Sequence, residues 1–271
     1  MSKFSRVRTV LCDLDGVVWL AHQPIAGSVD AVVRMRASGH RVLFVTNNSA
    51  STIADQEQAL QQIGIPASGD VVSSSMAAAR LLQRGERVLV TGGPGIVEAV
   101  ERQGAIAVRN TGAEISGPVD AVVVGLHRDF DYPRLAVAAT AVRAGARLIG
   151  TNGDATYPTA DGPAPGGGAI LAAVEAASGV TPQIAGKPHK SMAMLISEIL
   201  SAADQPFDPN SVLMVGDRPE TDGLFAAELQ CEFVLVRSGV VAPGEVVDSE
   251  VAVADDLPDL AALASALAEV D

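Results

Sequence analysis

The sequence predicts an α/β protein built on a Rossmann-like, doubly wound parallel sheet, with a second α/β domain inserted into the chain. Short apolar runs that suit buried strands alternate with segments of helical periodicity along the whole sequence. Small or charged residues directly follow several of these runs, as expected at the carboxyl ends of parallel strands, where ligands bind. The 271 residues, 48% of them hydrophobic, are enough for one large domain or two modest ones.

The first third of the chain begins the predicted sheet. Strands are expected at 7–12, 41–45 and 70–73, and helices at 28–38, 52–63 and 75–83. Ser28 is a candidate N-cap of the first helix, and Gly39 is expected to end that helix. Strands that alternate with helices in this way predict parallel pairing, with helices on both faces of the sheet.

The rest of the chain continues the alternation in two series. The middle series is predicted to hold strands at 87–90, 106–108, 121–124 and 147–149, helices at 96–103, 132–144 and 169–178, and a Gly- and Pro-rich loop at 161–168. The last series is predicted to hold strands at 212–215 and 233–236 and helices at 191–202, 221–229 and 257–268. The expected layout is a core formed by residues 1–80 and 185–271, with an inserted domain at 81–184.

Charge and hydropathy narrow the range of partners. The net charge of −13 and the pI near 4.7 argue against nucleic acids and anionic membrane surfaces. The chain has no apolar run of about 18 residues and its N-terminus lacks an apolar signal core, so a cytoplasmic protein is expected.

Cys12 and Cys231 lie in apolar segments without metal or redox spacing, and reduced core thiols are expected.

The most informative segment is a hydrophobic strand that ends in two aspartates. Asp13 and Asp15 follow the apolar residues 10–12 and point the same way, because side chains alternate along an extended chain. Gly16 then permits a sharp turn and a close approach to a ligand. Two carboxylates at the end of a buried strand are costly unless a cation neutralises them. The segment therefore indicates a divalent metal, a phosphate chemistry or both, although calcium loops and plain surface turns share the pattern.

Three further strand ends carry polar residues. Thr46 and Asn47 can donate hydrogen bonds to phosphate oxygens, or they can cap a helix or form an Asx turn. Lys187 offers a compact positive charge for a phosphate or a carboxylate cluster, although an isolated lysine is ordinarily a surface residue. Asp217 and Asp222 can ligate Mg²⁺ directly or through water, with helix capping as the alternative.

Together and in this order, the four segments resemble the motifs of the haloacid dehalogenase superfamily of aspartate-nucleophile phosphatases. The matching stretches are 12–18, 46–49, 186–188 and 216–222. The long insert between the second and third stretches resembles the large α/β cap of one branch, which includes phosphoglycolate, glycerol-phosphate, p-nitrophenyl phosphate, pyridoxal-phosphate and nucleotide phosphatases. The resemblance extends over about residues 7–265 and includes 122–125, 129–132 and 150–154 within the insert.

The resemblance implies Mg²⁺-dependent hydrolysis of a small phosphorylated metabolite. Asp13 is expected to attack phosphorus and form an aspartyl-phosphate, and Asp15 to act first as general acid and then as general base. Asp13, the main-chain carbonyl of Asp15, and Asp217 are expected to hold Mg²⁺. Asp222 is expected beside these metal ligands, where it orients a metal-bound water or Lys187. The expected phosphate-binding residues are Leu14, Thr46, Asn47 and Lys187.

The substrate and several details stay open. Glycerol 3-phosphate or 2-phosphoglycolate is preferred over nucleotides because the chain has few aromatic residues to stack a base. A nucleotide or sugar-phosphate phosphatase, a phosphotransferase and a non-enzymatic phosphate-ligand sensor are alternatives. The glycine-rich segment 88–95 mimics a dinucleotide-binding loop but has Glu98 where the third glycine would stand, so a plain turn is expected. The resemblance also implies a homodimer. Candidates for roles in specificity are His127, Arg128, Asn152 and Asp154.

Overall fold

The structure is a computed structural model that describes residues 4–159, 162–201, 206–242, 244–246 and 251–268. Contacts within the chain divide it into two compact units. The first unit comprises Met1–Thr46, Gln56–Val72 and Ile196–Asp271, and the second comprises Asn47–Asp55 and Ser73–Leu195. The expected domain boundaries after residues 80 and 184 remain a prediction, and the two units differ from them by placing 47–55, 73–80 and 185–195 in the second unit.

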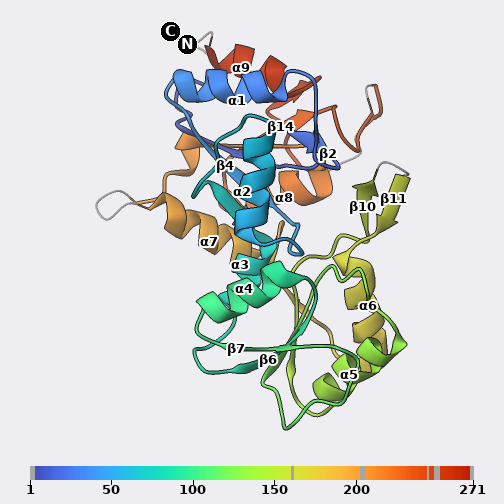
Figure 1. Cartoon of the computed structure of the whole chain (residues 1–271). Coiled ribbons are helices and arrows are strands. Elements are labelled where there is room, and N and C mark those ends of the chain that lie inside the picture. Colours follow the sequence, from blue (N-terminus) through green and yellow to red (C-terminus); the bar gives the residue numbers. More distant parts are fainter. Residues whose placement is uncertain (1–3, 160–161, 202–205, 243, 247–250, 269–271) are drawn as a thin grey trace. The chain divides into compact units, whose positions relative to one another are not determined.

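A six-stranded sheet forms the centre of the first unit (Figure 1). Its strands, in sheet order, are β15 (Asp255–Leu257), β14 (Glu232–Val236), β13 (Val212–Gly216), β1 (Thr9–Cys12), β4 (Arg41–Thr46) and β5 (Val71–Ser73). β1 runs parallel to β4 and β13, and β13, β14 and β15 are parallel in turn. Every residue of β1 and β13 is buried, which explains their continuous runs of apolar residues.

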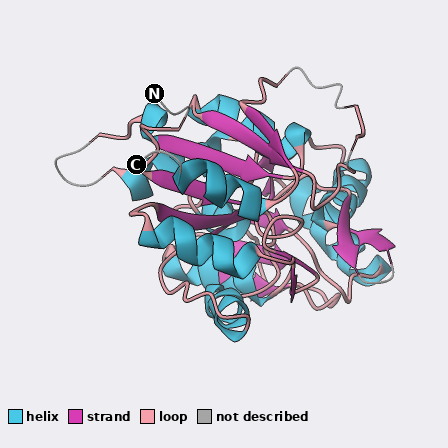
Figure 2. Cartoon of the chain, turned by 90° about the horizontal axis from the view of Figure 1, so that it is seen from above, coloured by secondary structure: helices cyan, strands magenta, loops and turns pink. Residues whose placement is uncertain are grey.

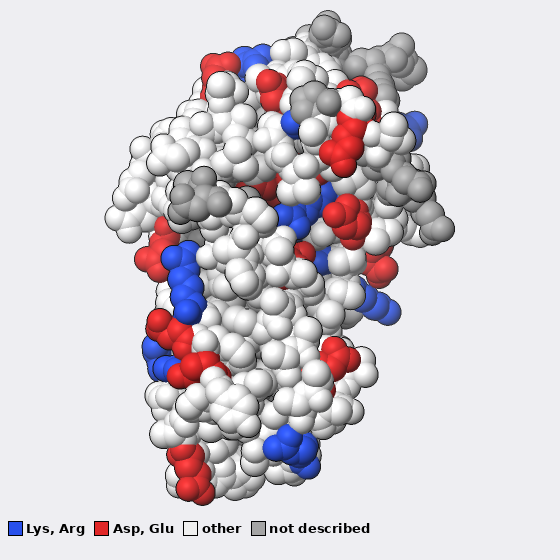
Figure 3. Space-filling model, turned by 90° about the vertical axis from the view of Figure 1, so that its right-hand side faces the viewer, with Lys and Arg blue, Asp and Glu red and all other residues white. Residues whose placement is uncertain are grey.

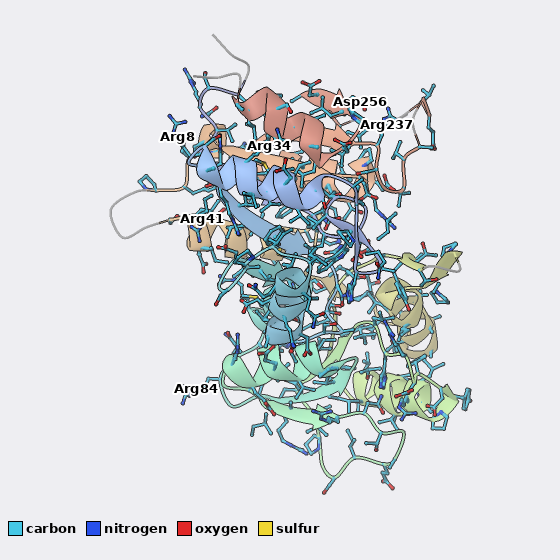
Figure 4. All side chains as sticks on the ribbon, turned by 45° about the horizontal axis from the view of Figure 1, so that its top comes forward. Arg8, Arg34, Arg41, Arg84, Arg237 and Asp256 are labelled. Atoms are coloured by element: carbon cyan, nitrogen blue, oxygen red, sulfur yellow. The ribbon has the colours of Figure 1, made fainter. Side chains whose placement is uncertain are left out.

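Helices cover both faces of this sheet (Figure 2). The chain moves from β1 to β4 in one direction and from β13 to β14 in the other, so right-handed crossovers place α1 (Ser28–Ala37) and α8 (Leu224–Leu229) on opposite faces. α1 packs beside α9 (Leu260–Ala268). Arg34 of α1, labelled in Figure 4, joins the two helices. It donates to the carbonyl of Ala261 and to the hydroxyl of Ser265, each at 3.2 Å.

The second unit holds a five-stranded parallel sheet. In sheet order its strands are β12 (Gln183–Ile184), β9 (Arg147–Gly150), β8 (Ala121–Val124), β6 (Arg87–Thr91) and β7 (Ile106–Arg109). α4 (Pro94–Arg102) packs on β6 and β7, with α3 (Ser74–Ala79) against it, while α5 (Tyr132–Arg143) and α6 (Gly167–Ser178) pack together on β8 and β9. Two helices, α2 (Ile53–Gln62) and α7 (Lys190–Leu200), are divided between the units: the first residues of each belong to the second unit and the remaining residues to the first. The two parallel sheets with their helices confirm the expected α/β fold class.

Two local expectations are corrected by the structure. The expected loop at 161–168 is partly an antiparallel hairpin of β10 (Thr156–Thr159) and β11 (Gly162–Pro165), and α6 then begins at Gly167; Asp161 lies outside the described residues. Prolines are tolerated in this hairpin because both of its strands are edges. The expected helix at 257–268 begins at Leu260, since 255–257 forms the edge strand β15.

Two helix starts also differ from expectation. Gly27, not Ser28, is the N-cap of α1, and the Ser28 hydroxyl donates instead to the carbonyl of Val18 at 2.7 Å. The expected helix at 221–229 is a π-helical turn, η2 (Pro219–Gly223), followed by α8. A short hairpin of β2 (Trp19–Leu20) and β3 (Gln23–Pro24) follows β1 and was not expected from the sequence. In the described part of the chain, no helix combines the length and apolar character that a membrane span needs.

Candidate active site

The sheet of the first unit reverses its strand order beside β1. β4 and β5 lie on one side of β1, whereas β13, β14 and β15 lie on its other side. The carboxyl ends of β1 and β13 therefore form a topological switch point. Cys12 pairs with Val215 in the parallel register, and the Asp13 N–H donates to the carbonyl of Val215 at 3.0 Å. This register brings Asp13, after β1, beside Asp217, after β13.

Three carboxylates converge at this point. One oxygen from each of Asp13, Asp217 and Asp222 lies within 4.8 Å of the others. Asp217 and Asp222 are each only 1% exposed, whereas Asp13 is half-buried. Glycines make this close packing feasible, because a Cβ on Gly16 or Gly239 would overlap the carboxylate of Asp217. The Asp222 carboxylate also accepts the N–H of Arg218 at 3.2 Å, so it is held at the start of η2.

The electrostatics of this cluster favour a bound cation. Burial, together with the charges of Asp13 and Asp222, raises the pKa of Asp217 to about 8, although the Val240 N–H opposes the shift by donating to Oδ2 at 2.7 Å. Oδ1 of Asp217 is buried and has no hydrogen-bond partner among the described residues. An oxygen-only set of close carboxylates with one unsatisfied oxygen suits a hard divalent cation such as Mg²⁺. The residues present therefore fit the expected metal.

The loop between Asp13 and Trp19 is ordered by its own backbone. The carbonyl of Leu14 accepts the N–H groups of Val18 at 2.9 Å and Trp19 at 3.1 Å, and the Gly16 N–H donates to the carbonyl of Trp19 at 2.8 Å. The side chain of Leu14 is apolar and 1% exposed, so a role in phosphate binding can fall only to its main chain. Asp15 is half-buried in this loop and is not part of the three-carboxylate cluster.

The loop after β14 takes part in the same arrangement and was not identified from the sequence. The Ser238 hydroxyl donates to the carbonyl of Gly16 at 2.7 Å, while Gly239 and Val240 contact Asp217. The available signal was a buried strand that ends in small residues, like the other strand ends, but with no carboxylate to draw attention to it.

The other expected phosphate-binding residues lie at the end of β4 and in the second unit. Thr46 is the last residue of β4 and is 2% exposed. In the second unit, Asn47 Oδ1 accepts the Lys187 N–H at 2.9 Å and Asn47 Nδ2 donates to the Lys187 carbonyl at 3.1 Å. Lys187 is 2% exposed, which is unusual for a lysine. The side chain of Asn47 thus positions the backbone of Lys187, and its direct contact with phosphate remains a prediction.

Two residues whose roles the sequence left open also contact Asn47. Asp154 Oδ2 accepts Asn47 Nδ2 at 3.0 Å, and Asn152 Nδ2 donates to the carbonyl of Asn47 at 2.7 Å. Their segment, Gly150 to Asp154, repeats the strand–Thr–Asn pattern of Thr46 and Asn47, which was the signal in the sequence. His127 and Arg128 follow β8, and burial is the largest cause that lowers the pKa of His127.

Figure 3 shows charged side chains of both signs in small groups, separated by uncharged surface, on one face of the molecule. The acidic excess of the chain is therefore not matched by a broad basic patch on this face.

Two family models match the chain. A haloacid dehalogenase-like hydrolase model matches residues 10–106, and a second, HAD-hydrolase-like model matches residues 184–260. The first match contains Asp13, Asp15 and Thr46, and the second contains Lys187, Asp217 and Asp222.

Known proteins resemble the chain over most of its length. A D-glycerol 3-phosphate phosphatase of Mycobacterium tuberculosis is 37% identical over 89% of this chain, which spans 66% of that relative. An acid sugar phosphatase of Staphylococcus aureus is 33% identical over 86% of this chain and 87% of its own length. The crystal structure of a glycerol phosphate phosphatase from Mycobacterium tuberculosis, in complex with magnesium, superposes with a TM-score of 0.78 at 34% identity, covering 89% of this chain and 70% of that one.

Proposed function

The chain belongs to the haloacid dehalogenase-like hydrolases and is a phosphatase, and we propose that it hydrolyses a small phosphomonoester, glycerol 3-phosphate or 2-phosphoglycolate, with Mg²⁺. The observation that carries this proposal is the cluster of Asp13, Asp217 and Asp222 at the switch point, with one buried oxygen unsatisfied. The name of the glycerol 3-phosphate phosphatase relative supports the first of the two substrates.

The chain offers the ligands that Mg²⁺ requires. In this proposal Asp13, the main-chain carbonyl of Asp15, and Asp217 hold the ion, and Asp222 lies beside them. Bound Mg²⁺ supplies the positive charge that lets three carboxylates share one site with a phosphate. The magnesium complex of the structural relative supports this assignment.

The proposed reaction proceeds in two displacements. The Asp13 carboxylate attacks phosphorus, the bond from phosphorus to the ester oxygen breaks, and an aspartyl-phosphate forms. Asp15 gives its proton to the departing alkoxide and then takes one from the water that attacks phosphorus, which releases phosphate and restores Asp13. Thr46, Lys187 and the main-chain N–H of Leu14 would stabilise the oxygens that are not transferred.

A sugar phosphate is the second candidate substrate, because the acid sugar phosphatase relative is matched over 87% of its length. A phosphotransferase would use the same intermediate and differ only in its acceptor. The expected homodimer and the expected cytoplasmic location remain predictions, and light scattering of the purified protein tests the first of them.

The test is phosphate release from a panel of small phosphomonoesters by the purified protein, with Mg²⁺ and with EDTA. Release should require Mg²⁺ and should disappear in Asp13→Asn, which cannot act as a nucleophile, while an acid-quenched wild type should carry one phosphoryl group by mass spectrometry. Asp208→Asn makes the same chemical change at an exposed residue and should leave release intact. The hydrolase proposal is wrong if the folded wild type with Mg²⁺ releases no phosphate from any ester, and transfer to an added alcohol instead would indicate a phosphotransferase.

A further inference from the structure

Asn47 is held from three directions within the second unit. Its carbonyl accepts Asn152 Nδ2 and the Ser74 hydroxyl, both at 2.7 Å. Its side-chain Nδ2 donates to Asp154 Oδ2 at 3.0 Å. These bonds fix both the backbone and the side chain of the residue that pairs with the backbone of Lys187.

The segment that supplies Asn152 and Asp154 is held by hydrogen bonds of its own. The Asp154 N–H donates to Asn152 Oδ1 at 3.1 Å, which closes an Asx turn. The Gly168 N–H, in the first turn of α6, donates to the carbonyl of Asp154 at 2.9 Å. Asn152 is 5% exposed. The turn therefore presents the Asp154 carboxylate to Asn47 from a fixed position.

The carboxylate of Asp154 selects one orientation of the Asn47 amide. An amide group can be turned so that its oxygen and nitrogen exchange places, but an ionised carboxylate can only accept hydrogen bonds. Nδ2 of Asn47 must therefore face Asp154, and Oδ1 then faces the Lys187 N–H. With the amide turned the other way, Oδ1 would face the Asp154 carboxylate and the Lys187 carbonyl, and each of these contacts would be repulsive.

We propose that Asp154 is a positioning residue that fixes Lys187 for phosphate binding by orienting the amide of Asn47. The proposal rests on the proposed function, in which Lys187 binds the substrate phosphate. Asp154 acts through Asn47 and need not touch the phosphate. Its loss should weaken the affinity for the phosphoryl group and leave the metal requirement unchanged.

The central test compares Asp154→Ala, Asp154→Asn, Asn47→Ala and the double variant. Asp154→Ala is expected to raise KM and the inhibition constant of orthophosphate by about tenfold, because a hydrogen bond to a charged group is lost. The Mg²⁺ concentration for half-maximal activity should not change. Asp154→Asn retains an acceptor oxygen and should restore most of the affinity. The double variant should be no worse than Asn47→Ala alone, because the two residues act in series.

A second measurement does not depend on activity. The Lys187 amide hydrogen is bonded to Asn47 Oδ1 and should exchange with solvent faster in Asp154→Ala than in the wild type. Asp131→Ala is the matched control, because it likewise removes a hydrogen-bonded carboxylate from the second unit, in this case one that accepts the backbone N–H of Arg134. It should change neither the inhibition constant of orthophosphate nor the exchange at Lys187.

The outcomes separate this inference from the proposed function. A wild type without phosphatase activity overturns the function, whereas an active wild type with an unaltered orthophosphate constant in Asp154→Ala overturns the role of Asp154. Additive effects in the double variant, or unchanged exchange at Lys187, would also overturn it. A weaker orthophosphate affinity with faster exchange, rescued by Asp154→Asn, would support it.

Discussion

The two units carry the same kind of parallel sheet, yet their switch points differ in charge. In the first unit, Asp13 and Asp217 follow β1 and β13, the strands at which the order reverses. In the second unit the order reverses between β6 and β8, which end at Thr91 and just before Gly125. Both positions are where ligands bind in open α/β sheets, so position alone does not distinguish them.

Hydrogen bonding does distinguish them. Asn110 Nδ2 donates to the Thr91 hydroxyl at 3.0 Å and to the Arg134 carbonyl at 2.9 Å, and the hydroxyls of Ser49 and Thr151 lie 2.9 Å apart. The neutral groups at the second switch point therefore satisfy one another. At the first switch point, Oδ1 of Asp217 has no such partner among the described residues.

The second switch point is also filled by the chain itself. A Cβ on Gly93, Gly95 or Gly125 would overlap atoms of the segment 49–51. The Gly95 N–H donates to the carbonyl of Ala50 at 3.0 Å. The glycines that mimic a dinucleotide-binding loop thus serve the close approach of this protein's own backbone. Unsatisfied charge, rather than a strand end alone, therefore marks the site of chemistry.

The largest expected effect comes from removing the charge at the first switch point. Asp217→Asn should lower kcat/KM on the order of 10³-fold, because a metal-binding carboxylate becomes a weak neutral ligand. At a pH above 8, where Asp217 is ionised, the metal-free variant should unfold at a higher temperature than the metal-free wild type, since a buried charge repelled by Asp13 and Asp222 is gone. Steady-state kinetics and thermal unfolding in EDTA measure both effects.

Asp208→Asn is the control for this change and should alter neither quantity. Near wild-type activity in Asp217→Asn, or a lower unfolding temperature without metal, would contradict the charge-based account of the first switch point.

The pH dependence of stability should also separate the two switch points. The pKa of Asp217 is about 8 in the folded protein, against 3.8 for an unperturbed aspartate, so the folded state keeps a proton that the unfolded state has lost between these values. The free energy of unfolding of the metal-free protein should therefore fall as the pH rises through this window, by at most about 1.4 kcal/mol per pH unit from this group. Urea unfolding in EDTA measures the slope.

Two comparisons make the pH prediction specific. The slope should be smaller in Asp217→Asn, and it should also be smaller in the wild type with saturating Mg²⁺, because the ion displaces the proton. Equal slopes in all three samples would show that Asp217 does not govern this dependence.

A moderate effect is expected from adding a Cβ at the switch point of the second unit, where the segment 49–51 already packs. Gly95→Ala would place a Cβ on the backbone of Ser51 and should cost about 1–3 kcal/mol of stability through overpacking. Gly153→Ala is the matched control, since its Cβ would meet only Ile184 at an ordinary 3.6 Å. Thermal unfolding of both variants measures the difference, and equal stability would mean that the segment 49–51 yields at little cost.

The smallest effect is expected from a carboxylate of the second unit. Asp131 is exposed and accepts the Arg134 N–H at 3.0 Å as the N-cap of α5, and this backbone hydrogen bond is the largest cause that lowers its pKa. Asp131→Ala should lower the unfolding temperature slightly and leave kcat and KM unchanged. The stabilisation should be lost in the wild type as acid protonates Asp131. A loss of activity comparable to that of Asp217→Asn would break the contrast between the two units.

Much of the secondary structure could be predicted from the pattern of apolar residues. Strands such as β8 and β13 were expected within one residue of their ends, because buried parallel strands are continuous apolar runs. The hairpin β10–β11 was missed, since its glycines and prolines are typical of loops and its pairing is antiparallel and local to an edge. Ser28 was wrongly expected to be the N-cap of α1, because its hydroxyl donates instead to the carbonyl of Val18, outside the helix.

Local patterns in the sequence were enough to predict which residues follow the strands, and so to identify Asp13, Asp217 and Lys187 as candidates, because alternation and strand ends are properties of short segments. Only the folded chain makes Asp13 and Asp217, some two hundred residues apart, neighbours, because their proximity depends on the pairing of β1 with β13. Folding likewise brings Asp154 to Asn47 and removes Asp217 from solvent. Burial and hydrogen-bond partners depend on segments that are distant in sequence, and local periodicity does not report them.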